Sequence, residues 1–183
     1  IKDAAALERL EKVDAVVFDK TGTLTEGKPK VVAVAAAEGW TEDEVIRLAA
    51  SLERASEHPL AHAIVASAQA RNLVLSNPSD VQSPVGKGVM GIVDGRRVVA
   101  GNSAFLQEQG VATAALDAAA DGYRRDGVTG IFVAVDGGLA GALGIADPVK
   151  ESTRPALAEL AKAGVRVIML TGDNRVTAEA VAR

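Results

Sequence analysis

The residues best suited to chemistry stand in one short segment, which begins at Asp19 and reads Asp-Lys-Thr-Gly-Thr-Leu-Thr. It follows the apolar run of residues 13–18, which predicts a buried strand. Ligands bind at the carboxyl ends of strands in open α/β sheets, and Gly22 lets the backbone turn so that its N–H groups can cradle phosphoryl oxygens. A carboxylate held there is a competent nucleophile toward phosphorus. The segment therefore predicts a site that presents the Asp19 carboxylate to a phosphate, with Lys20 and Thr21 supplying charge and hydrogen bonds.

A second strand end with polar residues lies near the other end of the chain. The apolar run of residues 165–170 is followed by Thr171, Gly172 and Asp173. Because this run and residues 13–18 end alike, we expect two neighbouring parallel strands, with Asp173 close to the nucleophile. Helices are predicted beside these strands over residues 4–12, 152–163 and from 175 onward.

The stretch of about 120 residues between these strands has a different pattern. Asp94-Gly95 and Asp136-Gly137-Gly138 each separate two β-prone runs and predict two hairpins. The expected strands cover residues 30–36, 81–85, 89–93, 98–100, 131–135 and 139–146. The expected helices cover residues 41–55, 59–71 and 114–125. The first of them begins with a capping box.

These elements predict two domains of different class. Residues 28–147 read as an α+β domain with an antiparallel sheet flanked by helices. We expect this domain to be inserted into an α/β domain that is split between residues 1–27 and 148–183. The two chain crossings between the domains would then act as a hinge.

Composition narrows the possible functions of the chain. Hydrophobic residues make up 48% and charged residues 24% of the 183, which is typical of a globular protein. The net charge is −4 and no basic block occurs, so nucleic acid is not an expected partner. Cysteine is absent, which excludes disulfides and thiolate metal sites. No apolar run reaches the roughly 18 residues that span a bilayer, and the chain begins at Ile1, so we expect a soluble piece of a longer protein.

Three polar clusters in the middle stretch indicate a ligand site. The first is a junction between two predicted helices that contains Glu53 and His58. The glutamate could accept a hydrogen bond from the exocyclic amine of adenine, and the imidazole could stack on the base or bond to it. The alternative is an ordinary helix junction with solvated acidic side chains.

The other two clusters are rich in glycine. Gly86 and Gly88 begin a G-x-G-x-x-G pattern that precedes a strand, so it is not a dinucleotide fingerprint. Glycines in this spacing would let a ligand approach the backbone, although a simple turn into the strand explains them equally well. Gly101 and Asn102 follow the next strand, where Asn102 could instead cap the following helix.

Taken in chain order, these motifs resemble the heavy-metal-transporting branch of P-type ATPases. The segment from Asp19 matches the phosphorylation signature of that family, and His58-Pro59 matches its histidine–proline signature. The resemblance implies that Asp19 becomes an aspartyl-phosphate. It also implies a phosphorylation domain of haloacid-dehalogenase-like fold, C-terminally incomplete here, with an inserted nucleotide-binding domain.

The same resemblance implies the ligands and their residues. ATP or ADP would bind in the inserted domain, and Mg²⁺ would bind beside the nucleophile, at Asp19 and Thr21. The implied catalytic residues are Asp19, Lys20, Thr21, Thr171, Gly172 and Asp173. The implied nucleotide contacts are Glu53, His58, Gly86, Gly88, Gly101 and Asn102. The partners would be the transmembrane and actuator domains of a pump, with this part on the cytoplasmic face of the membrane. Copper(I) is the favoured cargo, and zinc or cadmium comes next.

One part of the family pattern is missing. The second Mg²⁺-binding aspartate of the family lies in a Gly-Asp-Gly-x-Asn-Asp stretch beyond Arg183, as does a phosphate-pairing lysine. Metal and cation clamps carry much of phosphoryl-transfer catalysis. We therefore expect the isolated chain to bind nucleotide and to turn it over weakly or not at all.

Two other functions remain open from the residues. The chain could be a nucleotide-binding module without turnover. It could also be a phosphohydrolase of the haloacid-dehalogenase type, but such enzymes typically carry a second acid two residues after the nucleophile. Thr21 occupies that position here, which favours a long-lived phosphoenzyme and hence a pump.

Overall fold

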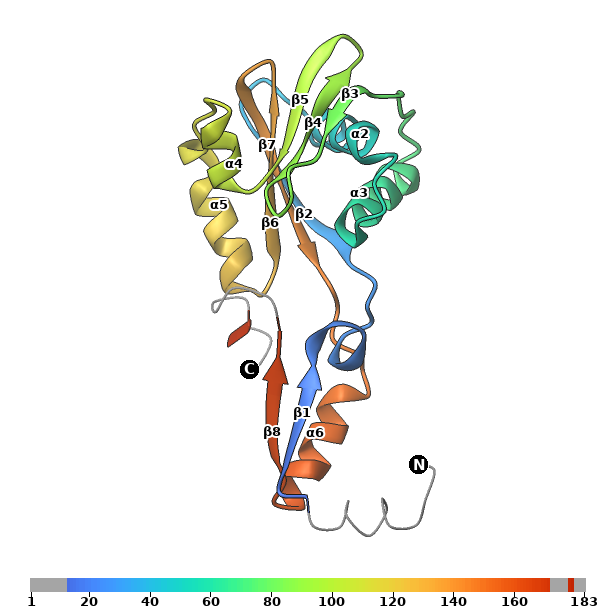
Figure 1. Cartoon of the computed structure of the whole chain (residues 1–183), viewed down its shortest axis with the longest axis vertical. Helices are drawn as coiled ribbons and strands as arrows, with labels where there is room; N and C mark the ends of the chain where they lie inside the picture. Colours follow the sequence, from blue (N-terminus) through green and yellow to red (C-terminus); the bar gives the residue numbers. More distant parts are fainter. Residues whose placement is uncertain (1–12, 172–177, 180–183) are drawn as a thin grey trace.

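The structure, a computed structural model, describes residues 13–171 and 178–179 and contains two sheets. Strands β1 (Ala15–Asp19) and β8 (Arg166–Leu170) pair in parallel, in the register that sets Asp19 opposite Leu170. The other sheet is antiparallel and has six strands in the order β2-β7-β6-β5-β4-β3. Its strands are β2 (Lys30–Ala36), β3 (Ser79–Gln82), β4 (Gly88–Val93), β5 (Arg96–Gly101), β6 (Thr129–Val135) and β7 (Gly138–Ala146). Figure 1 shows the two sheets at opposite ends of the molecule.

Both predicted hairpins are present, and their turns explain why. Asp94 and Gly95 between β4 and β5 have φ angles of 50° and 75°. Asp136 and Gly137 between β6 and β7 have φ angles of 51° and 83°. Two successive residues at positive φ form the turn whose twist matches that of the flanking strands, and Asp-Gly adopts it readily.

Helices cover both faces of the six-stranded sheet (Figure 1). One face carries α2 (Glu42–Glu53) and α3 (Pro59–Ala70), and the other carries α4 (Ser103–Glu108) and α5 (Ala114–Arg125). The predicted capping box opens α2, because the Glu44 amide donates to Thr41 Oγ1 and the Thr41 amide donates to Glu44 Oε2. Separate apolar cores lie under the two helical layers, the larger one around Ile46, Ile64 and Leu143.

Helix α6 (Thr153–Lys162) packs beside β8 at the other end of the molecule. The expected combination of an α/β part with parallel strands and an α+β part with an antiparallel sheet is thus confirmed. No helix in the described part of the chain has the length and apolarity to cross a bilayer.

Some predicted elements differ from those observed. The bounds of the strand predicted over residues 81–85 are wrong: β3 ends at Gln82, and residues 85–87 form a turn. Pro84 has no N–H to offer to a strand partner, and Gly86 takes a φ of +73°. The short helix α4 was expected only as the element that Asn102 could cap. The predicted helix over residues 4–12 lies outside the described residues, as does most of the one from 175 onward.

Candidate functional site

Asp19 is the last residue of β1, and its side chain is exposed. Its register partner Leu170 ends β8, and Thr171 follows directly, so the ends of both strands lie at one edge of the parallel pair. Figure 1 shows both strands pointing toward the six-stranded sheet. The predicted site residues Gly172 and Asp173 lie outside the described residues.

The segment after Asp19 folds back on itself over Lys20–Leu24. Gly22 allows this with a φ of +76°, and its N–H donates to Thr25 Oγ1 over 3.2 Å. The Thr25 N–H in turn donates to the Lys20 carbonyl over 3.1 Å. Because Thr25 is fully buried, the turn is anchored at its far end while Asp19 stays open to solvent.

The turn is also tied to the returning chain. Thr25 Oγ1 donates to Asp147 Oδ2 over 2.5 Å, and the Lys28 amide donates to Asp147 Oδ1 over 3.0 Å. We call this pair of bonds the Thr25–Asp147 clasp. Lys150 Nζ donates to the Gly22 carbonyl over 2.6 Å. Two side chains more than a hundred positions downstream therefore hold the turn, and sequence analysis did not single them out.

The oxygen atoms of Asp19 and Thr21 suit Mg²⁺, which prefers hard oxygen ligands. Within residues 13–171 and 178–179, no three acidic or histidine side chains gather where they could hold a metal. Mg²⁺ commonly binds through one or two carboxylates and keeps water or phosphate oxygens in its other positions. The donors at Asp19 fit that mode of binding.

A cavity of about 470 Å³ lies between α3 and the ends of β4, β5 and β6. All six residues predicted to contact nucleotide line it: Glu53, His58, Gly86, Gly88, Gly101 and Asn102. They come from three stretches of sequence that the sheet and the helices bring together. The volume is within the range of small-molecule binding sites.

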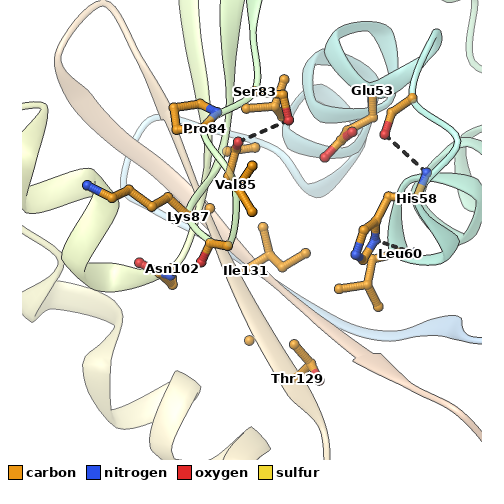
Figure 2. Close-up of a pocket in the computed structure, with 17 residues that line it drawn as sticks. Glu53, His58, Leu60, Ser83, Pro84, Val85, Lys87, Asn102, Thr129 and Ile131 are labelled. Atoms are coloured by element: carbon orange, nitrogen blue, oxygen red, sulfur yellow. Dashed lines mark hydrogen bonds between the residues drawn. The ribbon is translucent and has the colours of Figure 1, made fainter. Parts of the chain in front are cut away.

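Glu53 and His58 form one side of this cavity (Figure 2). Burial raises the pKa of Glu53, and a hydrogen bond from Ser56 and the nearby imidazole partly offset this. His58 caps α3, because its Nδ1 accepts a hydrogen bond from the Leu60 amide over 3.2 Å. The neutral ring must then carry its proton on Nε2. This side of the cavity thus offers one poorly solvated carboxylate acceptor and one ring N–H donor.

The glycines in the cavity wall serve different purposes. Gly88 and Gly101 face each other across β4 and β5, and a Cβ on Gly88 would lie 2.2 Å from the Ala100 carbonyl oxygen. A Cβ on Gly101 would lie 2.6 Å from the Lys87 carbonyl oxygen. Backbone atoms, and not space for a ligand, therefore occupy the positions of the missing side chains. Of these three glycines, only Gly86 has open space at its Cβ position.

Asn102 acts in the structure as a helix cap, the alternative that its position allowed. Its Oδ1 accepts from the Phe105 amide over 2.9 Å, and its Nδ2 donates to the Gly86 carbonyl over 3.2 Å. The same side chain thus starts α4 and holds the turn that precedes β4. Asn102 also lines the cavity, and its predicted contact with nucleotide stays a prediction.

Further lining residues were not predicted. Leu60, Val85 and Ile131 surround the space in Figure 2 and supply apolar surface on which a planar ring could stack. Val85 is fully exposed, which is costly for an apolar side chain unless something covers it. Lys87 also lines the cavity, and its Nζ lies 2.8 Å and 2.7 Å from the two carboxylate oxygens of Glu108. An apolar residue between proline and glycine in a turn was the one signal available for Val85.

Comparison with known proteins finds relatives that match the whole chain. A silver exporting P-type ATPase of Salmonella typhimurium is 49% identical over the whole chain, and a copper-transporting P-type ATPase of Rhizobium leguminosarum bv. viciae is 50% identical. The chain spans 22% of the length of each relative. A crystal structure of a zinc-transporting PIB-type ATPase in the E2.Pi state superposes with a TM-score of 0.81 at 36% identity, covering all of this chain and 29% of that one. These relatives confirm the resemblance to heavy-metal P-type ATPases.

The model of one family matches nearly the whole chain, over residues 13–183. Its description is a hydrolase, haloacid dehalogenase-like hydrolase. The match includes Asp19 with its turn, the six-stranded sheet and β8. The chain therefore belongs to the haloacid dehalogenase-like hydrolase family.

Proposed function

We propose that this chain is the ATP-binding and aspartyl-phosphorylation region of a P-type ATPase that exports a heavy-metal cation. Residues 28–147 bind the nucleotide, and residues 1–27 and 148–183 carry the phosphorylated aspartate. The transmembrane and actuator domains of the parent protein complete the pump, and the region lies on the cytoplasmic face of the membrane. Copper(I) is the favoured cargo because copper and silver exporters are the relatives with about half of their residues identical.

One observation carries the proposal. Three separate stretches of sequence converge on one cavity, and the strand that ends in Asp19 points toward the part of the molecule that holds it. The cavity offers apolar surface for a ring together with one acceptor and one donor. A purine base with an exocyclic amine matches that set.

We expect the base to bind at the Glu53 side of the cavity. The exocyclic amine of adenine donates to the Glu53 carboxylate, which regains there a hydrogen bond that burial denies it. The His58 Nε2–H donates to a ring nitrogen of the base. Leu60, Val85 and Ile131 cover the faces of the ring, and this contact removes the exposed side chain of Val85 from water.

The phosphoryl step takes place at Asp19. A carboxylate oxygen attacks the γ-phosphorus of ATP, the bond to the bridging oxygen breaks, and ADP leaves with that oxygen. The carboxylate attacks directly, without an activating base. Asp19 and Thr21 would hold Mg²⁺, which when bound would supply positive charge opposite the phosphate oxygens. We propose that Lys20, Thr171, Gly172 and Asp173 surround the transferred group.

The residue two positions after Asp19 separates this proposal from direct hydrolysis. A phosphohydrolase needs an acid to protonate its leaving group and then to activate water. Thr21 has no such proton-transfer group, so the aspartyl-phosphate persists. A long-lived phosphoenzyme suits a pump that must change conformation before hydrolysis.

Calorimetric titration of ATP into the chain tests the nucleotide site. His58→Asn removes the imidazole but keeps an oxygen that can cap α3. His62→Ala is the matched control, because His62 is exposed one turn further along α3 and does not line the cavity. We expect His58→Asn to weaken ATP binding about tenfold, as the loss of a good hydrogen bond does, and His62→Ala to change it less than twofold.

Two results would contradict the proposal. One is the absence of ATP binding to the unmodified chain at millimolar nucleotide. The other is equal affinity of His58→Asn and the unmodified chain, which would remove the imidazole from the site.

A further inference from the structure

The cavity has one positively charged side chain whose partner lies outside it. Of the described residues that line the cavity, only Lys87 carries a full positive charge. Its ammonium group is paired with both carboxylate oxygens of Glu108, at 2.8 Å and 2.7 Å. Glu108 ends α4 and is not part of the cavity wall.

Lys87 stands on the side of the cavity away from the base. Figure 2 shows Glu53 and His58 on one side, and Lys87 and Asn102 on the other. A nucleotide whose base contacts Glu53 therefore extends its phosphates away from that carboxylate, toward the lysine. The open space beside Gly86, the residue before Lys87, leaves room for phosphate oxygens there.

The backbone of Lys87 is fixed, but its side chain is not. The Lys87 amide donates to the Pro84 carbonyl over 3.2 Å, and the Lys87 carbonyl accepts from the Asn102 amide over 3.1 Å. The side chains of the ion pair are 47% and 50% exposed. A half-exposed ion pair is weak, and the four-carbon stem of lysine allows its head group to turn.

We propose that Lys87 exchanges partners when a nucleotide binds: it releases Glu108 and pairs with the phosphate oxygens. Glu108 then acts as a built-in competitor, which only a ligand with strong negative charge displaces. The pair thereby makes the cavity select nucleoside polyphosphates over nucleosides. This inference rests on the proposed nucleotide site and assigns to it a residue that selects between ligands.

Affinities for ATP and for adenosine in two single variants test the exchange. We expect Lys87→Met to weaken ATP binding about fivefold, the upper end for a half-exposed charge pair, and to leave adenosine binding within twofold. Glu108→Gln should tighten ATP binding about two- to threefold, because it frees the lysine and removes a negative charge near the phosphates. If the Lys87–Glu108 ion pair only fastened the turn to α4, Glu108→Gln would instead weaken the binding of both ATP and adenosine.

A charge swap gives an independent readout. The double variant Lys87→Glu, Glu108→Lys preserves an ion pair but moves the cation onto α4. A fastening role predicts recovery of ATP affinity in the swap, whereas partner exchange predicts an affinity no better than that of Lys87→Met. The control is Lys162→Met, because Lys162 makes a 2.7 Å pair with Glu159 on α6, far from the cavity.

The outcomes separate this inference from the proposed function. Suppose that the unmodified chain binds ATP, but Glu108→Gln weakens ATP binding or Lys87→Met leaves ATP binding unchanged. The proposed exchange of partners is then wrong, and the nucleotide site stands. If the unmodified chain binds neither ATP nor adenosine, both are wrong.

Discussion

Replacing Gly88 with alanine adds only one methyl group but should strongly destabilise the antiparallel sheet. The new Cβ would lie 2.2 Å from the Ala100 carbonyl oxygen and 2.7 Å from the Gly101 Cα. An ordinary carbon–oxygen contact needs about 3.3 Å, so β4 and β5 must separate by about 1 Å at this point. Overpacking of this kind costs about 1–3 kcal/mol, and each weakened ladder hydrogen bond adds about 1 kcal/mol. We expect a loss of about 3 kcal/mol in the free energy of unfolding.

Urea unfolding followed by the fluorescence of Trp40 measures this loss. Trp40 is the only tryptophan in the chain and packs against the core beneath α2 and α3. The centroid of its ring lies 5.0 Å from the Arg96 guanidinium carbon. Its emission therefore reports on the inserted sheet and not on β1 and β8. With a slope of about 2 kcal/mol per molar urea, the expected shift of the midpoint is about 1.5 M.

Gly86→Ala is the matched control, two positions away in the same motif. Its Cβ meets nothing within 4 Å, so only the φ of +73° opposes it, at about 1 kcal/mol. A midpoint for Gly88→Ala equal to that of Gly86→Ala would refute the steric argument. It would mean that the two strands can part at no cost.

Two further predictions concern the crossing and the cavity. Asp147→Asn should speed amide hydrogen exchange over residues 20–28 about tenfold, because it weakens the charge-assisted bonds from Thr25 and Lys28. The urea midpoint should not change, and unaltered exchange would show that the clasp contributes nothing. The raised pKa of Glu53 means that the folded state favours the protonated acid. The variant Glu53→Gln, which cannot ionise, tests this. As pH rises from below 4.5 through the raised pKa, the unmodified chain should lose stability relative to the Gln variant; a gain instead would contradict the burial effect.

Much of the fold was predictable because it is locally encoded. The Asp-Gly pairs specify hairpin turns through backbone conformations that few other residues adopt, and the capping box fixes the start of α2. The strand predicted over residues 30–36 has those bounds in the structure. The order of the six strands was not predictable, since β2 pairs with β7 more than a hundred residues away and no local signal encodes that choice.

The candidate site shows the same division. The motifs that pointed to nucleotide named six residues around one cavity, and their roles stay predictions. The side-chain contacts of Lys87 and Asp147 were not predicted, because their partners Glu108 and Thr25 are distant in sequence. The sequence also left two explanations of Gly88 open, for a related reason. A glycine that admits a ligand and one that admits a neighbouring strand look alike until the strand partner is known.

The crossing between the two parts of the molecule has a consequence for how such proteins can be assembled from pieces. The first and last strands of the inserted part are neighbours, with Lys30 opposite Ala146, and Asp147 bonds directly to the Lys28 amide. The insert therefore leaves and rejoins its host at almost one point, and its own sheet already holds its two ends together. Such an inserted part can be exchanged or lengthened at its hairpins. Neither change alters the distance between the two points at which the chain enters and leaves it.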